Sequence, residues 1–185
     1  MAHISSIGAG MYSDLSVCTD STQLGTIKAA VLAGSGEEAA FKAGFATTTL
    51  FERITNVREF PAMGTPPNVV NVPVYGQKTS SQIQGQADAP SMEITINYVP
   101  ADWATGTDLG KLVGDGNQYA FRFSLLNSEP AGYVSATTGL GTVQNSQYFW
   151  IGKVEALQVN PQLTDANTAT LTLTMQSEFY GAYTV

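Results

Sequence analysis

Residues 168–175 read TATLTLTM, a strict alternation of threonine with apolar residues that constrains the fold more than any other segment. Successive side chains of a β-strand point to opposite faces, so this period of two predicts a strand with one apolar and one polar face. Residues 91–99 show the same period, with an apolar side made of Met92, Ile94, Ile96 and Tyr98. We therefore predict two strands that each cover a core with one face and present short polar side chains with the other.

A third segment, residues 148–159, is apolar on both sides. One side carries Tyr148, Trp150 and Val154, and the other carries Phe149, Ile151 and Leu157. A strand of this kind is covered twice, either by two layers of its own chain or by its own core and another subunit. The turn formers of residues 160–167 join it to the threonine-rich segment, which predicts a hairpin.

Shorter segments favour a mainly β fold. Strand-like runs occupy residues 46–57, 69–76, 80–86 and 119–126. Thr107 is placed to cap a short helix over residues 108–113. We predict a β-sandwich or barrel-like sheet with a short flanking α-helix and extended loops.

The N-terminal part gives weaker signals. Residues 1–24 show no sustained period and are predicted to form an arm, and residues 26–32 are apolar enough for a short strand. Ser35 and Glu38 have the spacing of a capping box, which predicts a helix of about two turns that Gly44 would end.

Length and charge bound the class of protein. The chain has 185 residues, which favours one domain with appendages: an N-terminal arm with a short strand and helix over 1–45, and a β domain with a C-terminal tail over 46–185. Its net charge is -7 and its Lys and Arg residues are scattered, which does not favour a nucleic-acid binder. No apolar run approaches the roughly 20 residues that span a bilayer, so we expect no membrane contact.

Residue counts exclude several chemistries. The single histidine, His3, and the single cysteine, Cys18, allow no intramolecular disulfide and no zinc site built from Cys and His. The series Gly34-x-Gly36-x-x-Ala39 imitates a dinucleotide-binding fingerprint, but the helix after it is too short for a βαβ crossover. We expect no enzymatic activity, no metal and no cofactor.

Three stretches, taken in order, carry a family resemblance. They are LFERITNVREF from residue 50, the segment from VVNVPVYG to DLGKLV over residues 69–113, and YFWIGKVEALQV through TATLTLTMQSE over residues 148–178. In the middle stretch a strand passes a turn at Gly85, and a second strand ends at Tyr98 and Pro100. This order resembles the major tail tube proteins of long-tailed bacteriophages, especially the non-contractile, siphovirus type.

The resemblance implies a structural subunit of a virion tail, assembled in the bacterial cytoplasm. Such subunits form hexameric rings that stack around a tape-measure protein and end at tail tip and terminator proteins, and DNA later passes through the lumen without specific binding. A related contractile-tail or type VI secretion tube fits the same pattern. The alternative from another class is a small ligand-binding β-barrel, in which the two-faced segment 148–159 would line a pocket.

Two sets of residues are candidates for these roles. The polar sides of the alternating strands are predicted to face the lumen: Glu93, Thr95, Asn97, Thr168, Thr170, Thr172 and Thr174. Predicted contacts between subunits are Pro61, Pro66, Pro67, Trp150, Phe179, Tyr180 and Tyr183. Contacts between stacked rings are expected from the arm 1–24, the loops 61–68 and 128–146, and the aromatic tail 179–185.

Overall fold

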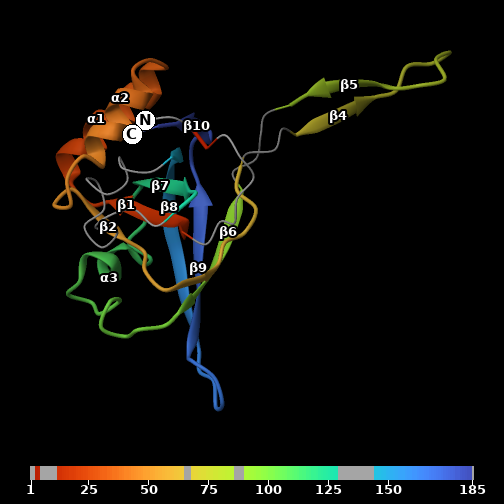
Figure 1. Ribbon diagram of the computed structural model, residues 1–185. Coiled ribbons are helices and arrows are strands. Elements are labelled where there is room, and N and C mark those ends of the chain that lie inside the picture. Colours follow the sequence, from red (N-terminus) through yellow and green to blue (C-terminus); the bar gives the residue numbers. More distant parts are fainter. Residues whose placement is uncertain (1–2, 5–11, 65–67, 86–89, 129–143, 185) are drawn as a thin grey trace.

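The computed structural model describes residues 3–4, 12–64, 68–85, 90–128 and 144–184. Its main feature is an eight-stranded sheet that curls around a core (Figure 1). Seven strands follow the order β2-β1-β7-β8-β9-β6-β3, and β10 pairs with β8. Their bounds are β1 Asp14–Cys18, β2 Phe51–Arg53, β3 Val57–Glu59, β6 Ser91–Asn97, β7 Tyr119–Leu126, β8 Asn145–Asn160, β9 Thr168–Met175 and β10 Tyr180–Tyr183. The expectation of a mainly β, barrel-like fold is confirmed.

The inner face of the curled sheet encloses the larger of two cores. Alternate residues of β6 and β9 enter it, as their period of two predicts, and Ile94, Leu171 and Leu173 are fully buried. The short helix α3 (Asp108–Leu112) adds two buried leucines to this core. Thr107 caps that helix as predicted, because its side chain accepts a hydrogen bond from the Gly110 N–H.

The outer face of the sheet carries a second core beneath α1 (Ser21–Ala33) and α2 (Glu37–Gly44), at the upper left of Figure 1. Phe41 of α2 stacks on Phe149 of β8 with ring centroids 5.1 Å apart. On the opposite face of the same strand, Trp150 stacks on Phe121 at 5.6 Å. The prediction that this strand is covered on both faces is confirmed for residues 148–154, where both layers belong to its own chain, whereas residues 155–160 are partly or fully exposed.

One detail of that strand was predicted wrongly. The pairing of β8 with β9 shifts register between Val154 and Ala156, so one extra residue enters the strand at Glu155. An extra residue reverses which face the following side chains occupy. Leu157 therefore lies opposite Leu171 and packs on the larger core, not with Phe149 as the unbroken alternation predicted.

The predicted N-terminal arm is wrong for residues 21–24, which begin helix α1 (Ser21–Ala33), and for residues 14–18. The latter form β1, which lies between β2 and β7 inside the sheet and is buried along its whole length. Five residues are too few to establish a period, and two of them, Asp14 and Ser16, are polar, which hides the strand in the sequence. The division of the chain at residue 45 stays a prediction, although β1 pairs with strands from beyond it.

The predicted strand over residues 26–32 is also wrong, because the segment lies within helix α1. Asp20 caps this helix by accepting a hydrogen bond from the Gln23 N–H at 2.8 Å. Leu24 and Ile27 face the core, but apolar residues also occupy the other sides of the helix, which removes the helical period from the sequence. Helix α2 has the predicted length and ends at Gly44, but Gly36 is its N-cap and the predicted Ser35 capping box does not form.

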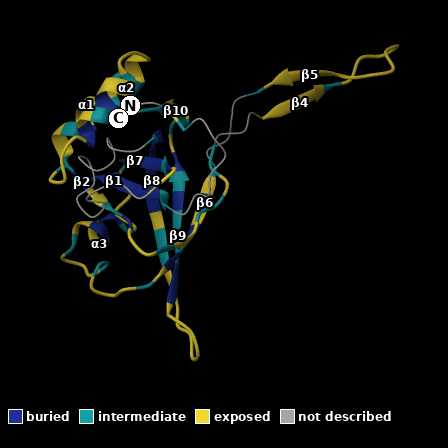
Figure 2. Cartoon of the chain, in the orientation of Figure 1, coloured by how far each residue is buried: buried dark blue, intermediate teal, exposed yellow. Residues whose placement is uncertain are grey.

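Strands β4 (Val69–Val72) and β5 (Ser81–Gln84) form a separate two-stranded sheet, as the short strand-like runs predicted. This hairpin projects away from the body on the side opposite α1 and α2 (Figure 1). Figure 2 shows that nearly all of it is exposed.

Candidate functional site

The predicted polar residues of β6 and β9 form one continuous surface. The register places Glu93 opposite Thr172, Thr95 opposite Thr170, and Asn97 opposite Thr168. Thr174 extends the same row at the other end, opposite Ser91. Glu93 and Asn97 are exposed and the other members are partly buried, except for Thr168, which is 8% exposed. The structure thus brings together the whole set that the sequence proposed as lumen-facing.

The surface is wider than the sequence indicated. On β8, Lys153, Ala156, Gln158 and Asn160 lie opposite the threonines of β9. On β3, Glu59 lies opposite Thr95. The bulge at Glu155 breaks the alternation of β8, so these residues show no period in the sequence. We call the combined surface of β8, β9, β6 and β3 the polar face.

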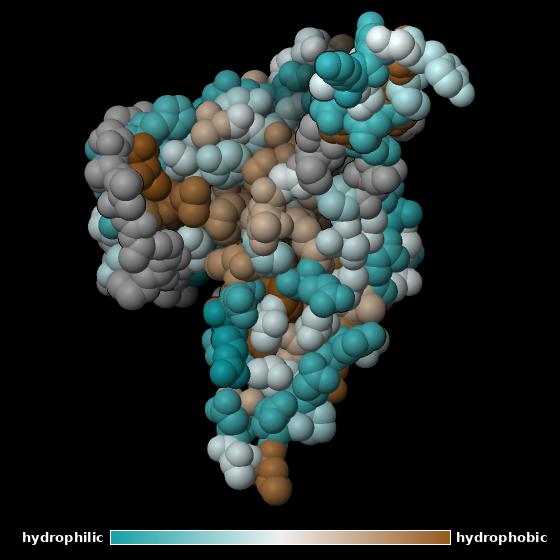
Figure 3. Space-filling view, turned by 90° about the vertical axis from the view of Figure 1, so that its right-hand side faces the viewer, coloured by the Kyte–Doolittle hydropathy of each residue, from teal (hydrophilic) through white to brown (hydrophobic). Residues whose placement is uncertain are grey.

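Few charges lie on the polar face. Its charged side chains in the described register are Lys153, Glu93 and Glu59, and the rest carry hydroxyl, amide or methyl groups. Seen from the side of the projecting hairpin, hydrophilic and near-neutral residues cover the lower part of the molecule, where β8 and β9 extend (Figure 3). Such a surface offers water hydrogen-bond donors and acceptors and has little net attraction to either sign of charge.

Both margins of the polar face are strand edges. β3 ends the sheet on one side. On the other side, the pairing of β8 with β7 stops at Gly152. From residue 155 to Asn160, β8 pairs with β9 along one edge, and no described strand pairs with its other edge. An unpaired strand edge carries free N–H and C=O groups and is a template for another strand.

A buried charge cluster fixes β1 within the sheet. The Arg53 Nε–H donates to Asp14 Oδ1 at 2.7 Å, and Arg122 Nη2 lies 3.7 Å from Asp14 Oδ2. Arg122 is 1% exposed, and its guanidinium lies over the rings of Phe45 and Phe51 at 4.9 and 4.7 Å. Burial lowers the pKa of Arg122 to about 10, and the Asp14 charge opposes that shift. The cluster joins three strands to the layer that carries the helices.

The predicted contact residues have different environments. Trp150 is fully buried in the larger core, so its side chain has no surface for another subunit, and that prediction is wrong. Phe179 stacks on Tyr148 at 5.2 Å, while Tyr180 and Tyr183 pack on the core beneath the helices. These three and Pro61 keep part of their surface, and their contacts with other subunits stay predictions. Pro66 and Pro67 lie outside the described residues, as does most of the loop 128–146.

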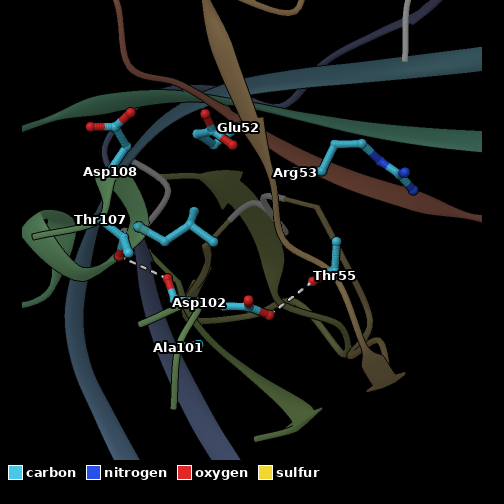
Figure 4. A pocket seen from close by; sticks show the side chains of 8 residues that line it. Glu52, Arg53, Thr55, Ala101, Asp102, Thr107 and Asp108 are labelled. Atoms are coloured by element: carbon cyan, nitrogen blue, oxygen red, sulfur yellow. Dashed lines mark hydrogen bonds between the residues drawn. The ribbon is translucent and has the colours of Figure 1, made fainter. Parts of the chain in front are cut away.

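A cavity of about 320 Å³ lies between β2 and the segment leading into α3 (Figure 4). Glu52, Asp102 and Asp108 line it, and the Thr55 hydroxyl donates to the Asp102 carboxylate at 3.5 Å. Burial, with a smaller contribution from Asp108, raises the pKa of Glu52. The lining residues include no cysteine or histidine. In the described parts of the chain, no three His, Cys, Asp or Glu side chains are placed so that together they could hold a metal ion.

Comparisons with known proteins show the fold. No protein-family model and no curated protein sequence matches this chain. A chain from the cryo-EM structure of the PVC sheath/tube terminator, part of an extracellular contractile injection system in its extended state, aligns with a TM-score of 0.54 at 11% identity, over 96% of this chain and 97% of that one. A chain from the extended PVC sheath-tube complex gives 0.54 at 10% identity, over 97% and 95%. This chain therefore has a tail tube-like fold.

The solved structures that share the fold come from a contractile injection system, whereas the sequence resemblance favours the non-contractile, siphovirus type. Within the described residues, no helix is long and apolar enough to cross a membrane.

Proposed function

We propose that this protein is a structural, non-enzymatic subunit of a phage-tail-like tube, of the kind found in contractile systems. The observation that carries the proposal is the polar face, a four-stranded surface of mostly short, uncharged side chains bounded by two strand edges. A surface of this form suits a wall between a protein core and a water-filled channel.

The two edges support ring closure. The β3 edge of one copy would pair with residues 155–160 of the next, which would extend the sheet across the boundary between subunits. A contact between two different surfaces of the same chain repeats head to tail and closes into a ring when its rotation allows. Six copies per ring, as in tail tubes, is the expectation from the resemblance.

The polar face would then line the lumen. Lys153, Glu93 and Glu59 leave each copy with a lining charge of -1, and the whole chain has a charge of -7. A lining without a basic stripe does not hold phosphates, so DNA would pass without specific binding. We also propose that the rings stack around a tape-measure protein, that the tube ends at tip and terminator proteins, and that it forms part of a virion tail.

Contacts between rings would come from partly exposed groups outside the two pairing edges, since those edges serve the ring. The loop that begins at Pro61 and the aromatic tail 179–184, whose strand β10 pairs with β8, keep enough exposed surface to contribute. Residues 14–18 cannot act as part of an arm, because they are buried in the sheet. The ligand-binding barrel has no comparable support, because core side chains fill the interior of the curl.

The test combines microscopy with hydrogen exchange. Purified protein should form rings or tubes in negative stain as its concentration rises. Backbone amides of residues 57–59 and 155–160 should exchange more slowly in the assembled protein than in dilute monomer, while the exposed turn 161–167 should not change. A compact monomer at every concentration would contradict the proposed function, and rings without protection of these edges would contradict the mode of closure.

A further inference from the structure

The β4–β5 hairpin carries an apolar face that nothing in the described chain covers. The register places Val70 opposite Ile83, so both side chains lie on one face of the hairpin, together with Val72. Val70 is 50% exposed and Ile83 is 58% exposed. At the tip, Val74 is 46% exposed and the Tyr75 side chain is fully exposed. Asn71, Gln82 and Gln84 lie on the opposite face together with Val69, so that face is mainly polar and the hairpin is amphipathic.

Such a hairpin needs a partner. A two-stranded hairpin alone is marginally stable in water and becomes stable when an apolar face packs on another surface. The hairpin projects clear of the body (Figures 1 and 2), so the body does not supply that surface. Lys78 is the only charged residue between Val69 and Gln84, which indicates an uncharged partner surface.

A second surface that no described part of the chain covers lies on the opposite side of the molecule, on helix α1. Its outward residues at helical spacing are Thr22, Gly25, Thr26, Ala29, Leu32 and Ala33. Leu32 is 90% exposed, and Lys28 is the only charged residue of the helix. A helix that is apolar on its buried side and uncharged on its outer side is typical of one covered on both sides.

We propose that the apolar face of the hairpin of one copy packs on the outward face of α1 of the next copy. This inference rests on the proposed function, because it needs copies that repeat head to tail. The chain places the hairpin between β3 and β6, the two strands at the edge where the next copy would join the sheet. A hairpin that leaves this edge and points outward therefore lies over the neighbour, on the side where the neighbour carries α1.

A competing surface is less suitable. Apolar side chains also gather in a hollow in the middle of the face seen from the hairpin side (Figure 3). The hollow and the hairpin lie on the same side of the molecule (Figure 3), so both face the same neighbour. In a head-to-tail series, the hairpin that reaches this molecule comes from the copy on its other side and would not meet the hollow. The outward face of α1, on the opposite side of the body, is the surface that a repeating contact brings beneath the hairpin.

Cysteine cross-linking tests the contact directly. The native Cys18 is fully buried and its pKa is raised to about 11 by burial, so it contributes little background. The double variant Leu32→Cys/Ile83→Cys, oxidised after assembly, should give a ladder of covalent species from dimer upward. Each single variant should stay monomeric on the gel, and a mixture of the two single variants should give dimers only, because the contact joins different residues.

The matched control uses Leu163, which is 100% exposed at the turn between β8 and β9. The variant Ile83→Cys/Leu163→Cys should give no ladder. Assemblies visible by negative stain that lack the 32–83 cross-link, or that cross-link 83 to 163 equally well, would overturn this inference and leave the tube proposal standing. Absence of any assembly would overturn both.

Discussion

The β8–β9 and β4–β5 hairpins are built from similar residues and have opposite environments. In β8–β9, Leu171, Leu173 and Val154 are at most 2% exposed, because they face the larger core inside the curled sheet. In β4–β5, Val70 and Ile83 also face each other across the strands, yet about half of each side chain meets water. Local sequence therefore specifies a strand pair, while its stability depends on what packs against it.

The largest expected effect comes from the core of the first hairpin. Replacing Trp150 by alanine removes a fully buried side chain that stacks on Phe121, and should lower the free energy of unfolding by about 3–5 kcal/mol. Ile83→Ala in the projecting hairpin should change the same quantity in the monomer by less than about 0.5 kcal/mol. Urea unfolding followed by circular dichroism measures both. Equal losses would refute the contrast between the hairpins.

A smaller loss is expected from the charge cluster. Arg122→Met leaves the buried Asp14 with Arg53 as its described cationic partner, and should destabilise the monomer by about 2–3 kcal/mol, somewhat less than the loss of a sole partner. The control is Arg58→Met, which breaks an ion pair with Asp165 whose two side chains are 52% and 63% exposed. That change should cost less than about 1 kcal/mol. An Arg122→Met variant as stable as the control would show that the cluster does not hold β1.

The sequence could predict strands where side-chain period and burial agree. Residues 91–97 and 168–175 have one buried face each, so alternation located both strands and the polar face that they share. It did not locate β1, because five residues with a buried Asp14 give no period, and its ion partners are distant in sequence. Arg122 inside an otherwise apolar strand is a signal of a buried ion pair, but not of the identity of its partner.

The surfaces proposed to take part in assembly were only partly predictable from the sequence. Threonine alternation indicated the polar face, but the β8 part of that face depends on the bulge at Glu155, which follows from the pairing with β9. The exposure of the β4–β5 hairpin was not predictable, because its valines and isoleucine read like those of a buried strand. A surface that another chain covers looks like core in the sequence.

The reactivity of Cys18 distinguishes a β1 fixed in the sheet from a loose arm. Burial raises the pKa of this thiol from 9.0 to about 11, so at pH 8 its thiolate fraction should be about a hundredfold lower than in unfolded protein. Labelling by a thiol reagent should be slowed by at least that factor and should become fast in denaturant. Rapid labelling of the native protein would show that residues 14–18 leave the sheet readily.

The smallest effect on stability is expected on the polar face. Glu93→Lys should leave folding and assembly nearly unchanged, because the side chain is exposed and no ion pair of it is described. Assembled Glu93→Lys protein should retain short DNA at low salt and release it as salt rises, since a basic lining attracts phosphates. Glu38→Lys on α2 makes the same change of charge outside the polar face, and it also breaks the exposed ion pair with Lys42. Equal DNA retention by the two variants would show that residue 93 does not line the lumen.

A cryo-EM map of the assembled protein would show directly where the polar face and the two strand edges lie. We expect rings or tubes in which Glu93 and Thr172 point into the lumen and the β3 edge of each copy lies beside residues 155–160 of the next. A map in which this face is turned outward or buried between copies, or in which the two edges do not meet, would contradict this arrangement.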